Sequence, residues 1–153
     1  MAQVEKTVLV MHSCAQMYAL VDDIEAYPTF LPWCGGTDLH ERTETSTHAT
    51  IHINYHGIKQ RFTTQNTKLF PHKMDIKLKD GPFKQLEGHW RFIELRPDAC
   101  KIEFKLQYEF ANALLEKMIA PVFSHISNTF VDSFVIHADN VYSASSTDSS
   151  IKK

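Results

Sequence analysis

Three histidines are the first residues whose type and spacing suggest chemistry. His48, His52 and His56 alternate with apolar residues, so they lie on one face of a predicted strand. Imidazoles are common metal ligands, but residues four apart in a strand are separated by about 13 Å, far more than two zinc–nitrogen bonds of about 2 Å can span. The spacing therefore favours solvated histidines over a metal centre.

Motifs for nucleophilic or nucleotide chemistry are missing from the sequence. The five glycines form no G-x-G-x-x-G or P-loop, and there is no G-x-S-x-G elbow. Cys14, Cys34 and Cys100 contain no C-x-x-C pair, which argues against a disulfide framework or zinc site and fits a reducing compartment. Acid–base catalysis in a pocket needs polar groups there, and the predicted inner faces offer mainly Tyr55, Tyr108 and Cys100. We therefore predict that the protein is not an enzyme.

The elements that position these residues follow from hydrophobic periodicity. β-Branched residues predict a strand over Val4–Met11, and Ser13 with Gln16 forms a capping box that begins a helix. Two prolines then predict an aromatic loop over Tyr27–Gly36. Residues 37–110 alternate with period two and predict a meander of about six strands. The strand around Phe62 is less apolar, so we expect it at a sheet edge or lining a partly polar space.

A long amphipathic helix is predicted after Asn112, a candidate N-cap, and extends to Tyr142 with a kink at Pro121. The Ser-rich tail, 143–153, is predicted to be disordered. These elements predict one α+β domain over residues 1–142. Its curved antiparallel sheet, of about seven strands, wraps the long C-terminal helix, and two short helices follow the first strand.

Composition limits the partners of this domain. The net charge of −2 gives no overall attraction for nucleic-acid backbones, so we expect no DNA binding. The N-terminal apolar run is too short for a signal peptide, which predicts a cytoplasmic protein. The chain has 10 Phe, 5 Tyr and 2 Trp, more than a minimal core requires. We therefore expect aromatic walls around a hydrophobic cavity between the sheet, the helix and the proline-rich loop.

Three segments also resemble a known family. They are Y-P-x-F-L-P-W-C from Tyr27, D-G-P-F-K-x-L-x-G-x-W-x-F from Asp80 and C-x-I-x-F from Cys100. Together they resemble the coenzyme Q-binding protein and ribosome association toxin (RatA-like) family of the START superfamily, within the polyketide cyclase/dehydrase and lipid transport group. The resemblance covers about Val4 to Tyr142 and implies a START-like helix-grip fold.

The resemblance also implies partners. It suggests ubiquinone or another polyisoprenoid lipid as the ligand, in a supporting role in respiration, with no required cofactor and with transient membrane contact. The alternative that it implies is a toxin that binds the large ribosomal subunit and blocks subunit joining. The label "cyclase" implies a further alternative, an aromatic polyketide cyclase, but kinship of fold does not carry chemistry with it.

Candidate ligand-binding residues are the large side chains of the predicted inner faces and of the aromatic loop. They are Tyr27, Phe30, Leu31, Trp33, Ile51, Ile53, Tyr55, Met74, Trp90, Phe92, Phe104, Leu106, Met118, Phe123 and Phe130. Two alternatives remain for Phe30 and Trp33, which either form the mouth of the cavity or fold back as a plug of the core.

Basic residues on predicted outer faces are candidates for contact with ribosomal RNA. They are Lys59, Arg61, Lys68, Lys73, Lys77, Lys79, Lys84 and Arg91. The alternative is a solvated sheet face in which acidic residues are interspersed.

Overall fold

The period-two segments form one antiparallel sheet. The structure is a computed structural model that describes residues 1–151, with the side chains of residues 1–142. Its strands are β1 Ala2–Val10, β2 Cys34–Arg42, β3 Ser46–Tyr55, β4 Ile58–Leu69, β5 Lys73–Asp80, β6 Phe83–Arg96 and β7 Ala99–Phe110. They are ordered β1-β7-β6-β5-β4-β3-β2, which confirms the predicted six-stranded meander within a sheet of seven strands and leaves β1 and β2 at the edges.

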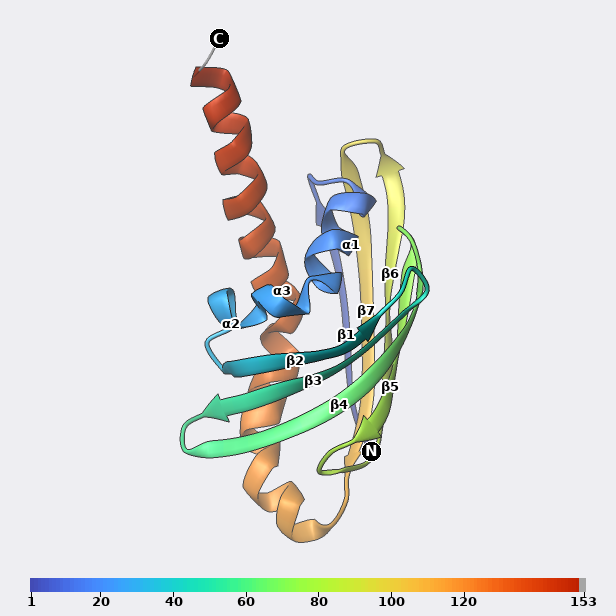
Figure 1. The fold of residues 1–153 in the computed structure, drawn as a ribbon, viewed down its shortest axis with the longest axis vertical. Helices are drawn as coiled ribbons and strands as arrows, with labels where there is room; N and C mark the ends of the chain where they lie inside the picture. The colour runs from blue at the N-terminus through green and yellow to red at the C-terminus, as the bar shows by residue number, and fades with distance from the viewer. Residues whose placement is uncertain (152–153) are drawn as a thin grey trace.

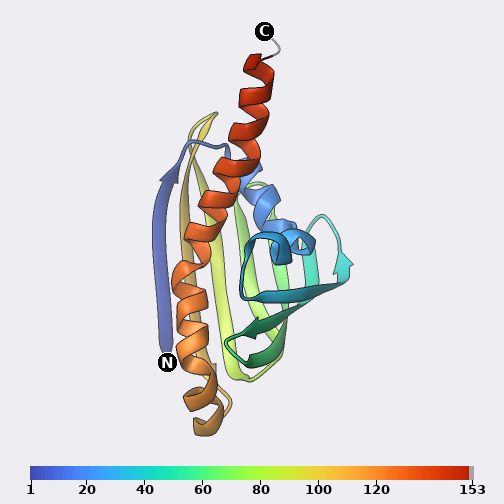
Figure 2. The same ribbon diagram turned by 90° about the vertical axis from the view of Figure 1, so that its left-hand side faces the viewer.

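Helices cover the concave face of this sheet. They are α1 Cys14–Asp22, the 3₁₀ turn η1 Ile24–Ala26, α2 Tyr27–Phe30 and α3 Ala113–Ile151. The sheet curves around α3, and α1 and α2 lie beside that helix (Figures 1 and 2). The predicted α+β helix-grip architecture is therefore confirmed.

The predicted helix starts are confirmed by their caps. The Ser13 hydroxyl accepts a hydrogen bond from the Gln16 amide at 3.1 Å, and the Gln16 side chain accepts one from the Ser13 amide at 2.9 Å. At α3, the Asn112 side chain accepts a hydrogen bond from the Leu115 amide at 2.9 Å. Each cap satisfies backbone donors that the first helical turn leaves free.

The end of α3 differs from the prediction. The helix continues to Ile151, whereas the apolar pattern in the sequence ends at Tyr142. The tail 143–153 was expected to be disordered. The structure does not describe the side chains of these residues, and it does not describe 152–153 at all. That expectation stays a prediction.

Two further predictions require correction. The segment Tyr27–Gly36 is not a continuous loop, because Tyr27–Phe30 forms α2 and Cys34 begins β2. Pro28 stands in the first turn of α2, where a missing backbone donor breaks no helical hydrogen bond. In addition, β4 is not an edge strand, since it pairs with β3 and β5. The other expectation for β4, a partly polar lining, is taken up below.

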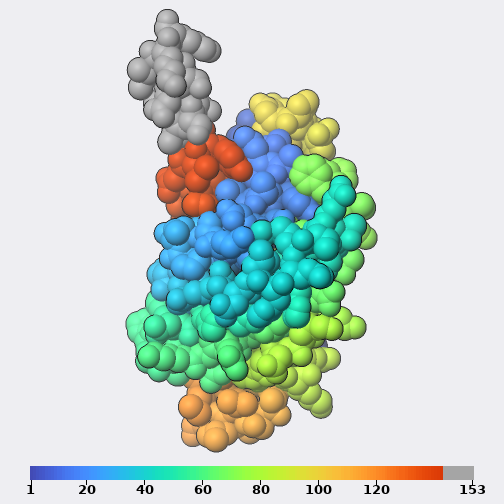
Figure 3. Space-filling model, in the orientation of Figure 1, coloured from blue at the N-terminus to red at the C-terminus, as the bar shows by residue number. Residues whose placement is uncertain are grey.

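Polar contacts hold α1 against α3. The Tyr142 hydroxyl donates to the carbonyl of Gln16 at 2.8 Å, and the His12 imidazole lies 2.8 Å from the Asp139 carboxylate. Figure 3 shows α1 (blue) seated between α3 (orange-red) and the β6–β7 hairpin (yellow). The first helix is therefore wedged between the long helix and the sheet.

We expect Gly88→Ala to lower the free energy of unfolding by about 2 kcal/mol, as overpacking does. A Cβ atom there would overlap the carbonyl oxygen of Lys105 and lie 3.1 Å from the Cα of Leu106. Gly36→Ala is the matched control, because its Cβ meets nothing closer than His52 at 3.9 Å. Urea denaturation of both variants checks this, and equal midpoints would contradict it.

Candidate functional site

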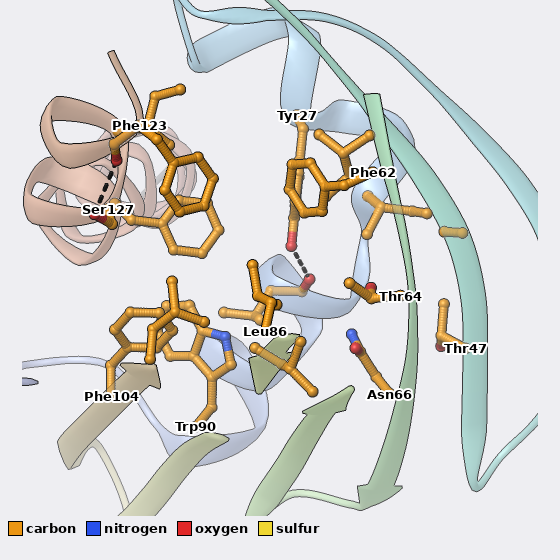
Figure 4. Close-up of a pocket in the computed structure, with 18 of the residues that line it drawn as sticks. Tyr27, Thr47, Phe62, Thr64, Asn66, Leu86, Trp90, Phe104, Phe123 and Ser127 are labelled. Carbon is orange, nitrogen blue, oxygen red and sulfur yellow. Dashed lines mark hydrogen bonds between the residues drawn. The ribbon is translucent and has the colours of Figure 1, made fainter. Parts of the chain in front are cut away.

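A mainly apolar cavity lies where the sheet, α3 and the first helices meet (Figure 4). Its lining residues are Val21, Ile24, Tyr27, Trp33, Thr47, Ala49, Ile51, Phe62, Thr64, Asn66, Ile76, Leu86, Trp90, Phe104, Leu106, Phe123, Ile126, Ser127 and Phe130. The empty space between them is about 750 Å³, but this figure includes space open to solvent.

The free space inside the cavity is small, because the centre of a water-sized sphere can reach only about 70 Å³ of it. One water needs about 10–15 Å³ of such volume, so the free space corresponds to that of a few waters. Because typical ligand pockets measure roughly 300–1,000 Å³, a large ligand must push the walls apart.

Register places the sheet residues of the lining side by side. The inner faces of β3 and β4 supply three opposed pairs: Thr47 with Asn66, Ala49 with Thr64, and Ile51 with Phe62. Asn66 is in turn opposite Ile76 of β5. Because side chains alternate along a strand, these rows all face the cavity.

Aromatic rings form the wall opposite this row. The ring of Phe130 on α3 lies 5.7 Å from those of Trp90 and Phe104, which are themselves 4.7 Å apart. Tilted and edge-to-face rings at these distances attract each other beyond their burial. The α3 side of the cavity is therefore a packed aromatic surface.

Two polar atoms in the lining have no partner among the described residues. The indole nitrogen of Trp33 and the amide oxygen of Asn66 are both buried without a hydrogen bond. By contrast, the Tyr27 hydroxyl donates to the carbonyl of Val21, and the Ser127 hydroxyl donates to that of Phe123. An unpaired buried group costs about 1–3 kcal/mol.

A buried ion pair lies next to Thr47, at the polar edge of the cavity. The Lys68 ammonium is only 3% exposed and lies 3.2 Å from a carboxylate oxygen of Asp22. The same oxygen accepts a hydrogen bond from the Thr47 hydroxyl at 3.0 Å. The prediction of Lys68 as an accessible basic residue is therefore wrong, because a carboxylate distant in sequence neutralises it inside the fold.

Arg42 extends this network toward the surface. Its guanidinium donates to both carboxylate oxygens of Glu25, at 3.0 and 2.6 Å, and to the carbonyl of Asp22 at 2.7 Å. These hydrogen bonds lower the pKa of Glu25 below its usual range. The network fastens the end of α1 and η1 to β2, β3 and β4.

Eight predicted ligand-binding residues come together in the lining. They are Tyr27, Trp33, Ile51, Trp90, Phe104, Leu106, Phe123 and Phe130. Ile53, Leu31, Met74 and Phe92 are buried in the core outside the cavity. Their apolar character predicted burial correctly, but it does not distinguish the core from the cavity.

Three predicted residues lie nearer the surface. Met118 is 50% exposed and does not line the cavity, so its prediction as a cavity residue is wrong. Tyr55 stacks on His125 at 5.7 Å, and Phe30 stacks on His137 at 3.8 Å. These two rings are partly buried and pack against α3.

Of the two alternatives for Trp33, the structure supports the plug. Its side chain is only 2% exposed and packs 6.1 Å from the ring of Phe130. The partly buried Phe30 does not reach the cavity. The aromatic segment is therefore a wall rather than an open mouth.

Sequence reasoning did not select the polar lining residues Thr47, Asn66 and Ser127. For Asn66 a signal existed, because lining a partly polar space was one of the two expectations for the strand around Phe62, and the same alternation continues to Asn66. Thr47 and Ser127 carried a similar signal. Thr47 is two residues before Ala49 on the same strand face, and Ser127 shares the helix face of Phe123 and Phe130 by its spacing of four and three residues.

The histidines of β3 lie on the outer face of the sheet. His52 is 2.6 Å from the Asp38 carboxylate, and the rings of His40 and His48 are 4.9 Å apart. Across the described residues, no three metal-ligating side chains gather closely enough to hold a metal ion. A separate finding is that no helix in the described part of the chain combines the length and apolarity needed to cross a membrane.

Breaking the buried ion pair tests the network. We expect Lys68→Met to lower the free energy of unfolding by about 2 kcal/mol, because it removes the buried cation of the partly buried Asp22 carboxylate and leaves only the longer pair with Arg42, at 3.6 Å. Lys84→Met is the control, since Lys84 is 73% exposed and its pair with Glu109 should contribute less than about 1 kcal/mol. Thermal and urea denaturation at neutral pH measure both, and indistinguishable stabilities would refute the role of Lys68.

Comparison with known proteins agrees with this geometry. Residues 10–135 match the family described as polyketide cyclase / dehydrase and lipid transport. The Escherichia coli K12 protein named ribosome association toxin RatA is 41% identical over 94% of this chain and 91% of its own length. The Xenopus laevis protein named mitochondrial coenzyme Q-binding protein COQ10 homolog B is 27% identical over 85% of this chain, but this match spans only 55% of that protein.

A solved structure shows the same fold. The ZhuI aromatase/cyclase from Streptomyces sp. R1128 superposes with a TM-score of 0.77 over 90% of this chain and 93% of that one, at 15% identity. At that identity the likeness concerns the fold alone. The sequence match and the gripped helix lead to one conclusion: this chain belongs to the polyketide cyclase / dehydrase and lipid transport family, with START-like architecture.

Proposed function

We propose that the protein binds an apolar small molecule in the cavity between the sheet and α3, and acts as a cytoplasmic carrier or chaperone that needs no cofactor. The observation that carries this proposal is the mainly apolar lining, with an aromatic wall on its α3 side. Burial of ligand hydrocarbon there yields about 25 cal/mol per Å². A polyisoprenoid quinone such as ubiquinone is the candidate ligand, supported by the relative named as a coenzyme Q-binding protein.

The chemistry of the lining supports binding without catalysis. Among the described residues, Tyr27 is the one lining side chain with an ordinary acid–base group, and burial raises its pKa further. The polar groups considered for a cyclase, Tyr55, Tyr108 and Cys100, do not line the cavity. Burial also raises the pKa of Cys100 to about 12, which keeps that thiol protonated. General acid–base catalysis needs a group that titrates near the working pH.

Filling the cavity tests the carrier function. Ser127 is 2% exposed and lines the cavity, so Ser127→Leu adds a side chain where ligand hydrocarbon would lie. Overpacking of this kind costs about 1–3 kcal/mol, so we expect roughly tenfold less lipid to be retained through purification. Organic extraction followed by mass spectrometry measures the amount, and exposed Ser124→Leu on the same helix is the control.

The outcomes of this extraction are distinct. Wild type and Ser124→Leu should yield the same apolar molecule, and Ser127→Leu should yield little of it. If the folded wild type neither retains an apolar molecule nor takes one up from added short-chain quinone, the carrier proposal is wrong.

A second candidate function is association with the large ribosomal subunit. The supporting observation is the relative named ribosome association toxin RatA, whose identity to this chain exceeds that of the coenzyme Q-binding relative. Lys59, Arg61, Lys77 and Lys79 lie exposed on the outer face of β4 and β5. Phosphate contacts from such a face lose affinity steeply with salt.

Charge reversal tests this second function. We expect wild-type protein to raise the proportion of free subunits in sucrose gradients, and Lys77→Glu to weaken that effect and reduce the salt slope of binding by about one. Lys117→Glu is the control, because it makes the same charge change at an exposed site on α3. An unchanged ratio of subunits to assembled ribosomes with wild-type protein at every salt concentration would exclude the function.

A further inference from the structure

Three of the polar residues that line the cavity are gathered on one side of it. Thr47, Thr64 and Asn66 lie together, and the amide of Asn66 points inward from the sheet, across from Phe123 and Ser127 (Figure 4). Their register explains the grouping, since Thr47 and Asn66 are direct partners and Thr64 is two residues from Asn66 on the same face. The cavity therefore has a polar side and an aromatic side.

The polar side is uncharged. None of the described residues that line the cavity carries a charge at neutral pH. Asp22 and Lys68 lie next to Thr47, but they are bonded to each other at 3.2 Å and the Thr47 hydroxyl is already bonded to Asp22. A carboxylate or phosphate head group would enter without a counter-ion, which is strongly unfavourable in a buried site. The site therefore selects a neutral head group.

The unpaired atoms determine what that head group must offer. The amide oxygen of Asn66 is a hydrogen-bond acceptor without a donor, and the indole nitrogen of Trp33 is a donor without an acceptor. A ligand carbonyl can accept from Trp33 or from the amide nitrogen of Asn66, but it leaves the Asn66 oxygen unpaired. A ligand hydroxyl both donates and accepts, so it suits Asn66 with the Thr64 hydroxyl beside it.

We propose that the cavity recognises an uncharged, hydroxyl-bearing amphiphile, whose hydroxyl bonds Asn66 and whose hydrocarbon packs on Phe123 and Phe130. This inference rests on the proposed carrier function and adds an orientation and a selectivity to it. For a redox-active aromatic ligand, the dihydroxy form binds more tightly than the matching dione, because only the dihydroxy form brings donors. Asn66 is the residue that sets this preference.

A matched pair of probes tests the proposal. Equilibrium dialysis under anaerobic conditions compares a decyl benzoquinone with the corresponding decyl hydroquinone, its two-electron, two-proton reduced form, which has the same tail, an aromatic ring and two hydroxyl donors. We expect wild-type protein to bind the hydroquinone about fivefold more tightly, the gain typical of one neutral hydrogen bond. Asn66→Leu should bring the ratio to about one, whereas Asn54→Leu, at an exposed position of β3, should preserve it.

A third probe keeps the test independent of how Asn66→Leu folds. The dimethyl ether of the hydroquinone has the same ring and tail but no donor, so it should bind wild-type protein as weakly as the quinone. Equal affinities for all three probes would overturn the hydroxyl selectivity and leave the carrier function intact. If none of the probes binds, the carrier function fails and this inference fails with it.

Discussion

The width of the sheet is the constraint on which the rest of the structure depends. Seven strands spaced about 4.8 Å apart are far wider than one helix of about 10 Å, so α3 alone cannot cover the apolar face. The sheet curves, and α1, η1 and α2 cover what α3 leaves open. The cavity lies where α3 meets these shorter helices, with Ile24 and Tyr27 on one side and Phe123 and Phe130 on the other.

The shorter helices need more than apolar contact to stay in place. They are only nine, three and four residues long, so each buries little surface. The pairs of Asp22 with Lys68 and of Arg42 with Glu25 supply directional bonds at the point where α1 ends. Because Thr47 bonds the same aspartate and also lines the cavity, the position of α1 and the polar side of the cavity are linked through one carboxylate.

Local patterns were sufficient to predict the helices and strands. The place of a strand in the sheet and the exposure of single residues depend on long-range contacts, which local patterns do not reveal. Alternation gave the strands, and the capping residues Ser13 and Asn112 gave the helix starts. The less apolar row from Ile58 to Thr64 misled the placement of β4, because such a row suggests a sheet edge, whereas β4 pairs on both sides and Phe62 and Thr64 line the cavity. Likewise, Met118 has the periodicity of a core residue, yet it lies in the first turns of α3, where its side chain remains exposed.

The small free volume of the cavity has a consequence for exchange. Because only about 70 Å³ is free inside it, the proposed ligand fits only molecules in which the walls of the cavity have moved apart. The apparent affinity is then lower than the intrinsic affinity by the fraction of such molecules. Loading and release would therefore be timed by the movement of these walls.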